Sequence, residues 1–241
     1  MQFYLPYAKI FCMNNFEVQQ IAKQTFKYLQ ANIRVGMHLP ELRKIAEKKM
    51  TELGATSFWY WDVGAFIFSG GDTALSVSGR HYKTAEKVIA ENDIITVDLS
   101  PQVGNVWGDF ARTIIIENGK VIPSTDRIKN EEWKNGLLAE EKLHGELMNF
   151  ASPETTFEEL YFYMNDLINQ SGYKNLDFMG NLGHSIAAKK DDRIYIERGN
   201  LARLNSVEYF TFEPHIALPN GRYGYKRENI YYFEKGKLKE L

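Results

Sequence analysis

The sequence predicts a single α+β domain, and three observations support this prediction. The chain has 241 residues, of which 44% are hydrophobic and 25% are charged. This composition is globular, and the length favours one large domain over two. Amphipathic helical segments mix with β-type runs, and those runs come in adjacent pairs. A doubly wound parallel sheet would instead require a regular alternation of strands and helices.

Four segments carry the pattern of helices. Apolar residues recur at helical spacing over residues 15–31 and again over residues 39–53. Gly54 suits the position just after the second helix, because glycine adopts the left-handed conformation that often ends a helix. Two further helices are expected over residues 126–150 and 156–168.

β-type runs lie between and after these helices. Residues 56–69 predict a strand, or a hairpin interrupted at residues 62–64. Residues 94–99 and 110–116 predict two strands on either side of a turn that contains glycine. Shorter runs follow in the last part of the chain, at residues 194–196, 206–212, 216 and 230–233.

Charge and hydropathy limit the classes of molecule that the chain is expected to bind. Lys and Arg total 29 and Asp and Glu total 31, which gives a formal net charge of −2. A near-neutral chain has no global electrostatic reason to bind nucleic acid or an anionic membrane. No apolar run is long enough to span a bilayer, and the N-terminus lacks the basic and apolar regions of a signal peptide.

The number of cysteines indicates the cellular compartment in which the chain is expected. Cys12 is the only cysteine, so the chain forms no intrachain disulfide and no cysteine-cluster metal site. A reducing compartment is the natural interpretation, and the cytoplasm is the expected location by default. A homodimer is expected only because two-fold dimers are the commonest oligomers.

The most informative local motif is ITVDLSPQVGNVWGDFARTI, at residues 95–114. Asp98 ends one apolar strand and Asp109 begins the next, so a hairpin would bring the two carboxylates together. Buried carboxylates require a positive partner, and a divalent metal ion is the strongest such partner. Asp is also common at strand ends, so both residues could instead simply cap turns.

A second motif, GHSIA at residues 183–187, offers a histidine and a serine. His184 could ligate a metal ion through a ring nitrogen, or it could be a hydrogen-bonded histidine of the core. The motif also resembles the nucleophile elbow of serine hydrolases, with Ser185 as the nucleophile. That elbow requires a strand before it and a helix after it, and the flanking sequences have neither pattern. A serine hydrolase is therefore disfavoured.

Two glutamates complete the set of candidate ligands. Glu213 ends a strand-like run before a proline, and Glu228 begins the apolar run near the C-terminus. Each alone could be a solvated edge residue. In combination, two Asp, one His and two Glu beside apolar strands provide hard oxygen ligands and one imidazole, which suit two divalent ions. Four carboxylates also balance the charge of two such ions.

Taken together, these motifs resemble the metal-dependent hydrolases with the pita-bread fold, which include methionine aminopeptidase, aminopeptidase P, prolidase and creatinase. The matching stretches occur in family order and are SVSGRHY, NDIITVDLSPQVGNVWGDFARTI, GNLGHSIA, FTFEPHI and YKRENIYYF. The upstream stretch VGMHLPELRKIAEKKMTELGA resembles the family's helical lead-in. The resemblance implies a curved, mostly antiparallel sheet covered by helices, in one catalytic domain over residues 1–241.

The resemblance also implies a role for each candidate ligand. Asp98 would be a terminal ligand of one metal ion. Asp109 and Glu228 would bridge two ions, and His184 and Glu213 would complete the shell of the other. Glu213 would also accept the proton of the attacking water and pass it to the leaving amine.

One further histidine gains a role only from the resemblance. His81, in SGRHY, matches the substrate-binding histidine of the family. It would lie outside the metal shell and donate a hydrogen bond to the substrate or the tetrahedral intermediate. Without the resemblance, His81 would be interpreted as an ordinary surface residue after a glycine turn.

The sequence also departs from the family pattern. The peptidases usually carry a second histidine seven positions after the metal histidine, and here that position is Asp191. His215 stands where the family often has glycine, so it either takes over a substrate contact or is neutral. The chain is expected to lack the extra N-terminal domain of many relatives, and it looks closest to a stand-alone Xaa-Pro aminopeptidase-like catalytic domain. Arg112 is expected to serve its strand or a ligand carboxylate, or to lie at a solvated edge.

The function that follows is hydrolysis of amide or peptide bonds with two divalent ions, by an aminopeptidase or Xaa-Pro peptidase that acts on short peptides. Mn, Co, Fe and Zn are all suitable, with Mn slightly favoured. Two alternatives stay open because of the missing second histidine. One is a non-peptidase hydrolase on the same scaffold, as creatinase is, and the other is a non-catalytic binding protein that retains the fold.

Overall fold

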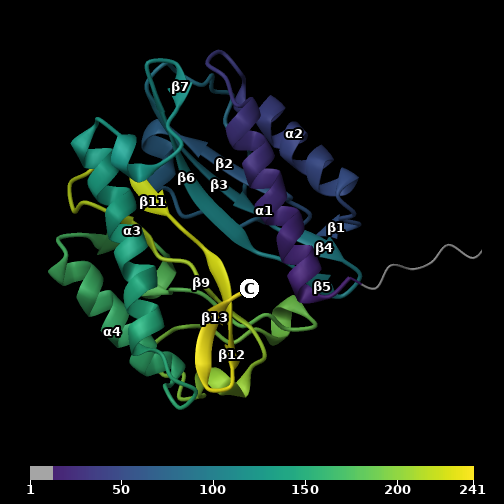
Figure 1. Cartoon of the computed structure of the whole chain (residues 1–241), viewed down its shortest axis with the longest axis vertical. Helices are drawn as coiled ribbons and strands as arrows, with labels where there is room; N and C mark the ends of the chain where they lie inside the picture. The colour runs from purple at the N-terminus through teal and green to yellow at the C-terminus, as the bar shows by residue number, and fades with distance from the viewer. Residues whose placement is uncertain (1–12) are drawn as a thin grey trace, which may run out of the picture.

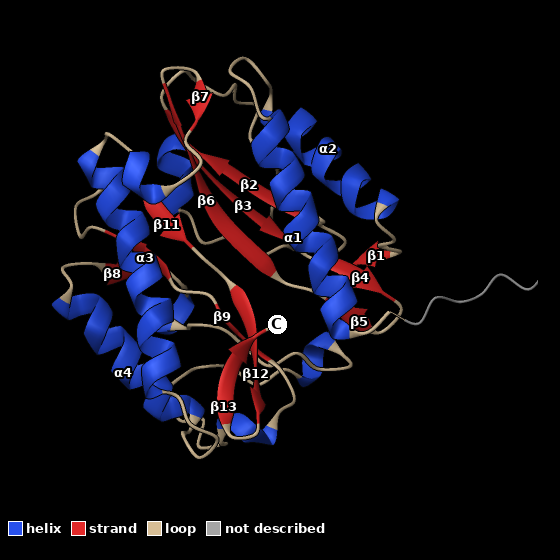
Figure 2. Ribbon diagram, in the orientation of Figure 1, coloured by secondary structure: helices blue, strands red, loops and turns tan. Residues whose placement is uncertain are grey.

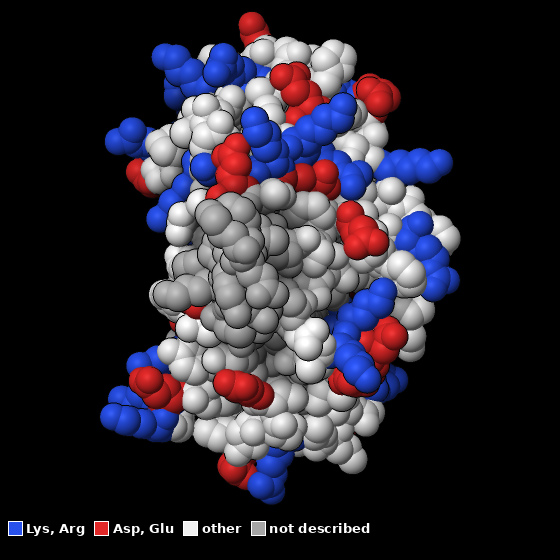
Figure 3. All heavy atoms as spheres, turned by 90° about the vertical axis from the view of Figure 1, so that its right-hand side faces the viewer, with Lys and Arg blue, Asp and Glu red and all other residues white. Residues whose placement is uncertain are grey.

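The computed structural model describes residues 13–241. The expectations that concern Cys12 and the absence of a signal peptide therefore fall outside the described residues. Within the described part of the chain, no helix is long and apolar enough to cross a membrane. On the face shown in Figure 3, basic and acidic side chains are interspersed.

The first two predicted helices are confirmed as α1 (Asn15–Asn32) and α2 (Leu39–Glu52). Asn14 and Glu17 form a capping box at the start of α1, which satisfies backbone donors that a helix leaves free. Gly54 follows α2 with a φ of 111°, the left-handed conformation predicted for it. Both helices pack against one face of the central sheet (Figure 1).

The central sheet has the strand order β2-β3-β6-β7, with β2 at Ala65–Ser69, β3 at Asp93–Leu99, β6 at Phe110–Glu117 and β7 at Lys120–Val121. The predicted pair of strands around a glycine turn is therefore confirmed as β3 and β6. The segment between them forms β4 (Pro101–Val103) and β5 (Val106–Trp107), which pair with each other, and β4 also pairs with β1 (Ser57–Phe58). Since β1 and β2 join different sheets, residues 56–69 are not a hairpin.

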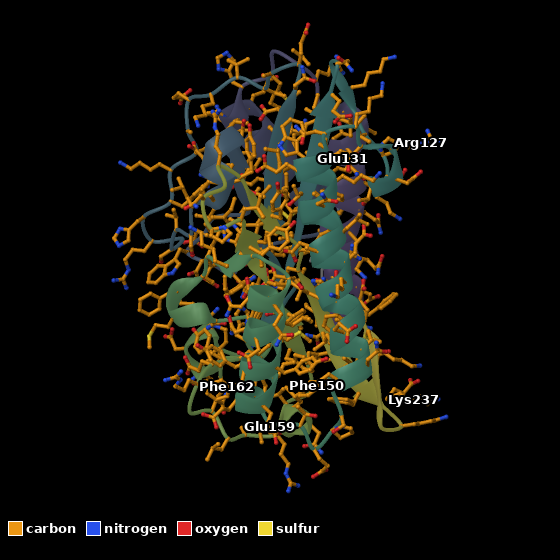
Figure 4. The ribbon with its side chains drawn as sticks, turned by 90° about the vertical axis from the view of Figure 1, so that its left-hand side faces the viewer. Arg127, Glu131, Phe150, Glu159, Phe162 and Lys237 are labelled. Carbon is orange, nitrogen blue, oxygen red and sulfur yellow. The ribbon has the colours of Figure 1, made fainter. Side chains whose placement is uncertain are left out.

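The second half of the chain contributes α3 (Glu131–Phe150) and α4 (Phe157–Gln170). Figure 4 shows these helices side by side, with Glu131 at one end of α3 and Phe150 at the other. The predicted helix over residues 126–150 begins five residues late, because residues 125–127 form a separate 3₁₀ turn and Asn130 caps α3. Thr156 and Glu159 form the capping box of α4.

Short strands complete the fold. Two more antiparallel sheets have the orders β11-β10-β8 and β13-β12-β9, and the described strands all pair in antiparallel fashion. Figure 2 shows the strands at the centre with helices on both sides. Their bounds are β8 Lys174–Asn175, β9 Phe210–Phe212, β10 His215–Ala217, β11 Gly224–Lys226, β12 Asn229–Glu234 and β13 Lys237–Glu240.

Two expected strands differ from the prediction. Residues 194–196 make only a single bridge, between Tyr195 and His184. Ile196 is nevertheless fully buried in a hydrophobic core, so its apolar character serves packing and not a ladder. The run at 206–212 shortens to the three residues of β9, because its first residue ends a 3₁₀ turn.

The buried side chains form two main hydrophobic cores. One core joins α1 and α2 to β2, β3 and β6, and the other joins α3 and α4 to β9, β10 and β12. The two faces of β3 and β6 are shared between them, since Ile95 belongs to the first core and Ile94 to the second. The ends of β3 and β6 therefore lie where the two halves of the chain meet.

Candidate metal centre

The five predicted ligands come from both halves of the chain and are linked by contacts. Asp98 lies near the end of β3, and Asp109 immediately precedes β6. His184 pairs with β9 through its backbone, and Glu213 follows that strand. Glu228 lies between β11 and β12. The four carboxylates and the imidazole thus meet at the junction of the two cores.

Strand pairing explains why Asp98 and Glu228 approach each other. In the β3–β6 ladder, Asp98 is opposite Ala111. The carbonyl oxygen of Ala111 accepts a hydrogen bond of 2.9 Å from the backbone N–H of Glu228. One residue of β6 therefore connects the segments that carry these two ligands, which are far apart in the sequence.

His184 presents one ring nitrogen to the carboxylates. Its Nδ1 lies 3.1 Å from the carbonyl oxygen of Ser185, so Nδ1 carries the proton and Nε2 keeps a lone pair. Nε2 lies 3.6 Å from an oxygen of Asp109 and 3.7 Å from an oxygen of Glu213. Burial, and then the positive charge of Arg193, lower the pKa of His184 to about 3. Nε2 consequently presents a lone pair to the carboxyl groups of Asp109 and Glu213.

Gly183 fixes the backbone before this histidine. Its φ is 137°, and a Cβ atom there would lie 2.4 Å from the carbonyl oxygen of Thr211. The same strand residue receives a hydrogen bond of 3.0 Å from the backbone N–H of His184 through its hydroxyl oxygen. Only a glycine allows this close approach, which sets the position of the imidazole against β9.

Two carboxylates of the site, Asp109 and Glu228, are deeply buried. Asp109 and Glu228 are 4% and 1% exposed, and neither oxygen of Glu228 finds a hydrogen-bond donor among residues 13–241. Burial, and then the charges of neighbouring carboxylates, raise the pKa of both side chains well above the ordinary range. Such groups require a cation or a proton.

Lys226 supplies part of the positive charge. Its Nζ lies 2.7 Å from Asp98 and 3.1 Å from Glu213. Burial lowers the pKa of Lys226, but the attraction of these two carboxylates outweighs burial and leaves the pKa well above its usual value. Burial raises the pKa of Glu213 to about 7 in spite of the lysine. One ammonium group cannot neutralise four carboxylates.

The residues present fit a divalent ion. Asp109, His184 and Glu228 each offer one ligand atom, these atoms all lie within 4.8 Å of one another, and all three side chains are buried. The donor set of carboxylate oxygens and one imidazole suits Mn, Fe, Co or Zn. The two oxygens of Glu228 that lack a donor are explained if a cation is their partner.

Several residues that position the ligands were not predicted from the sequence. Gln19 of α1 forms two hydrogen bonds with the backbone of Asp109, of 2.7 and 2.9 Å. The indole N–H of Trp107 donates to the carbonyl of Ala187, the last residue of the His184 motif. Lys226 likewise gives no local signal, because its partners lie far away in the sequence. The only hint in the sequence is that Lys226 lies close to Glu228 along the chain.

Arg112 holds the segment around Glu228. Its guanidinium donates to the carbonyl oxygens of Ala111 and Glu228, at 2.7 and 2.6 Å, and to the side chain of Asn229 at 2.5 Å. The arginine contacts the backbone and not the carboxylate of Glu228. It is half-buried and thus supports the segment that carries Glu228, and it is not a solvated edge residue.

The other sequence candidates fall in different places. His215 is buried in the pocket wall, where Nε2 lies 2.7 Å from the carbonyl oxygen of Thr73. His81 is exposed and is not among the described residues that line the pocket, although residues 75–78 line it. Asp191 is also exposed and outside that lining. Ser185 is buried and accepts a hydrogen bond from the backbone of Ile194, so it is a structural residue.

The site opens into a pocket with a volume of about 630 Å³, within the usual range for small-molecule sites. Asp98, Asp109, His184 and Glu213 contribute to its floor. Its walls are largely aromatic and polar, and they include Trp59, Tyr60, Phe66, Phe68, Phe178, Asp177, Arg193, Tyr195, Glu197 and His215.

Comparison with known proteins gives a family match and several similar folds. The model of metallopeptidase family M24 matches residues 16–235. Among solved structures, an X-Pro aminopeptidase from Thermotoga maritima has a TM-score of 0.73 at 23% identity, over 94% of this chain and 59% of that chain. A prolidase from Pyrococcus furiosus has a TM-score of 0.73 at 22% identity, over 94% of this chain and 61% of that chain. The search of curated proteins found no match.

A third structure is similar along its whole length. The methionine aminopeptidase from Thermotoga maritima has a TM-score of 0.72 at 13% identity, over 93% of both chains. This chain spans only about 60% of the X-Pro aminopeptidase and prolidase chains. At these identities the likeness concerns the fold, and it confirms the pita-bread fold implied by the sequence motifs.

Proposed function

The chain belongs to metallopeptidase family M24, and from that premise we propose that it hydrolyses peptide bonds in short peptides with divalent metal ions. The observation that carries this proposal is the buried group of Asp109, His184 and Glu228. Its ligand atoms lie close together, and the carboxylate of Glu228 has no donor among residues 13–241. A pocket of about 630 Å³ gives access to it.

The proposed ligand set has two ions and five side chains. From the resemblance to the family, Asp109 and Glu228 would bridge the ions, and both carboxylates are buried. Asp98 would be a terminal ligand of one ion, and His184 and Glu213 would bind the other. Two divalent ions would offset the four carboxylates, and Mn is the ion that we favour.

The chain's own residues would perform the remaining steps. Bound divalent ions supply Lewis acidity, which activates water and polarises a carbonyl group. Glu213 lines the pocket and would accept the proton of the attacking water and pass it to the leaving amine. Its pKa of about 7 in the absence of a metal ion reflects how readily this carboxylate takes up a proton.

Two histidines would contact the substrate in different ways. His215 lines the pocket, and its Nε2 is occupied by the carbonyl of Thr73. Nδ1 is therefore the nitrogen left to accept a hydrogen bond from a substrate N–H. His81 is exposed, so it would reach only a substrate that extends to the pocket mouth, next to the lining residues 75–78.

The test begins with metal analysis of gently purified protein. A panel of dipeptides, including Xaa-Pro dipeptides, is then assayed after addition of Mn, Co or Zn. Cleavage that depends on metal, and that is lost in Asp109→Asn, supports the proposal. Bound metal without cleavage of any peptide would refute it and favour a hydrolase of other amides on the same scaffold.

A further inference from the structure

A second cavity lies next to the metal centre, between α1 and α3. Its walls come from α1, β6, the segment after β7, α3 and the end of β11 (Figure 1). Its volume is about 200 Å³, roughly seven times the share of one water molecule in the liquid. Among the described residues, Lys226 alone lines both this cavity and the pocket of the metal centre. The second cavity is therefore a separate space, and the proposed reaction makes no use of it.

A buried carboxylate without a partner lines the second cavity. Glu140 is 3% exposed, and neither of its oxygens has a hydrogen-bond donor within residues 13–241. Burial raises the pKa of Glu140 well above its ordinary range, and the positive charge of Arg227, the largest opposing influence, does not cancel this effect. Such a carboxylate needs a proton or a positively charged partner, because a buried unpaired charge is costly.

An arginine without a partner lines the same cavity. The Nε of Arg227 is buried and has no acceptor in the described part of the chain. No carboxylate of residues 13–241 lies within ion-pair distance of its guanidinium. Arg227 and Glu140 are thus opposite charges that line one cavity without reaching each other. Buried charges are normally paired, so a third group between them would satisfy both.

A second guanidinium adds positive charge to the second cavity. Arg112 lines it and donates hydrogen bonds to two backbone carbonyls and to the side chain of Asn229, and not to a carboxylate. Burial, and then the positive charge of Arg227, lower the pKa of Arg112 to about 9. The two guanidinium groups therefore lie close enough to repel each other.

An occupant of the second cavity has to satisfy groups of both signs. A simple cation would pair with Glu140 but would face the charges of the two arginines. A simple anion would pair with an arginine but would lie beside the carboxylate of Glu140. A small zwitterion avoids both conflicts, since its ammonium group can pair with Glu140 and its carboxylate with a guanidinium.

The rest of the second cavity suits an amino acid with a small side chain. Phe26, Ile122 and Leu137 provide apolar walls. Pro123 and Ser124 line the cavity and are exposed, so a molecule can enter from the solvent. The volume is below the usual range for larger ligands, which restricts the occupant to a small molecule.

We infer that the second cavity binds a free α-amino acid with a small side chain, whose ammonium group pairs with Glu140 and whose carboxylate pairs with Arg227. The inference goes beyond the proposed function and does not rest on it, since binding requires neither metal nor catalysis. Arg227 immediately precedes Glu228. The bound amino acid would therefore lie against the segment that carries a proposed metal ligand.

The experiment titrates glycine, alanine and proline into the full chain and follows binding by calorimetry. A chelator is present, because amino acids also bind divalent ions. Acetate and methylamine each carry only one of the two recognised charges, and they serve as comparison probes. We expect at least one of the amino acids to bind roughly tenfold to a hundredfold more tightly than either probe, the range of one charge-assisted hydrogen bond.

Two variants test the two ends of the ligand. Glu140→Gln and Arg227→Gln should each weaken the binding of that amino acid by a similar factor, because each removes one charged partner. Glu140→Gln also removes an unpaired buried charge, so it should fold, and a melting curve checks this. The matched control is Glu197→Gln, since Glu197 is an exposed acid that lines the pocket of the metal centre. The control should keep the full affinity.

Three results would overturn the inference. If none of the amino acids binds, water alone fills the second cavity. If acetate or methylamine binds as tightly as the amino acids, the cavity is a site for a simple anion or a simple cation. If affinity is lost in Glu197→Gln and kept in Glu140→Gln, the amino acid binds in the pocket of the metal centre.

Discussion

Replacement of Glu228 by Gln should stabilise the metal-free protein and weaken the binding of metal. Glu228 is 1% exposed, and neither of its oxygens has a donor within residues 13–241. Asp109 and Glu213 add like charge to the same site. Glutamine has nearly the same shape but carries no charge, so the repulsion disappears together with a ligand oxygen.

The magnitude follows from the burial of the carboxylate. A buried polar group without a partner costs about 1–3 kcal/mol, and the amide recovers roughly 1–2 kcal/mol of this because it is neutral. For a chain of this size each kcal/mol raises the melting temperature by about 2–4 °C. The metal-free variant should therefore melt roughly 2–8 °C higher than the unmodified protein.

Metal should reverse this order. A ligand at a hundred times its Kd stabilises a protein by about 2.7 kcal/mol. If the loss of one carboxylate weakens binding about a hundredfold, the same concentration of metal gives only about 0.4 kcal/mol. With a chelator the variant should therefore have the higher melting temperature, and with Mn the unmodified protein should have the higher melting temperature.

The control for this experiment is Glu140→Gln. Glu140 is 3% exposed and both of its oxygens also lack a donor among the described residues, but it lines a separate cavity of about 200 Å³. Its variant should keep the full metal-induced shift. A Glu228→Gln variant that also keeps the full shift would refute the assignment of Glu228 as a ligand.

Three further predictions concern other parts of the site. Gly183→Ala should lower the free energy of unfolding by about 2–5 kcal/mol, because the Cβ atom would lie 2.4 Å from the Thr211 carbonyl oxygen. Gly145→Ala, with open space around it, should be neutral or stabilising in thermal melts. Lys226→Met should destabilise the metal-free protein by about 3–5 kcal/mol, because it leaves two carboxylates unpaired, and should raise the affinity for Mn in a titration. Between about pH 4 and pH 7 the unfolded chain has lost carboxyl protons that Glu213, with its pKa raised to about 7, still holds. The stability of the metal-free protein should therefore fall as the pH rises through this window. A melting temperature that rises with pH over this window would contradict the raised pKa of Glu213.

Periodicity predicted the helices well because each of them buries one apolar face. Residues such as Ile21, Leu29 and Leu42 are both periodic and buried. The strand predicted at residues 194–196 was wrong, because a buried apolar run forms a strand only where a neighbouring strand can pair with it. Ile196 packs in the second core without such a ladder.

The candidate metal ligands could be predicted from the sequence because they lie in several motifs that occur in the family's order. The sequence could not reveal how distant segments support that set. Gln19 contacts the backbone of Asp109 across 90 positions, and Lys226 contacts Asp98 across 128. Such partners follow from tertiary packing, which local patterns do not encode. The exposure of His81 agrees with the interpretation of this residue without the resemblance, as a surface residue after a glycine turn.

The meeting of two cores at the ligands has a practical consequence. Asp98 and Asp109 belong to the segment before β7, while His184, Glu213 and Glu228 follow α3. A chain cut in the connection between β7 and α3 would give two fragments, each with only some of the five proposed metal ligands. A cation would then strengthen their reassembly beyond the apolar contacts that Ile94 and Ile115 make in the second core, and a chelator would weaken the assembled pair.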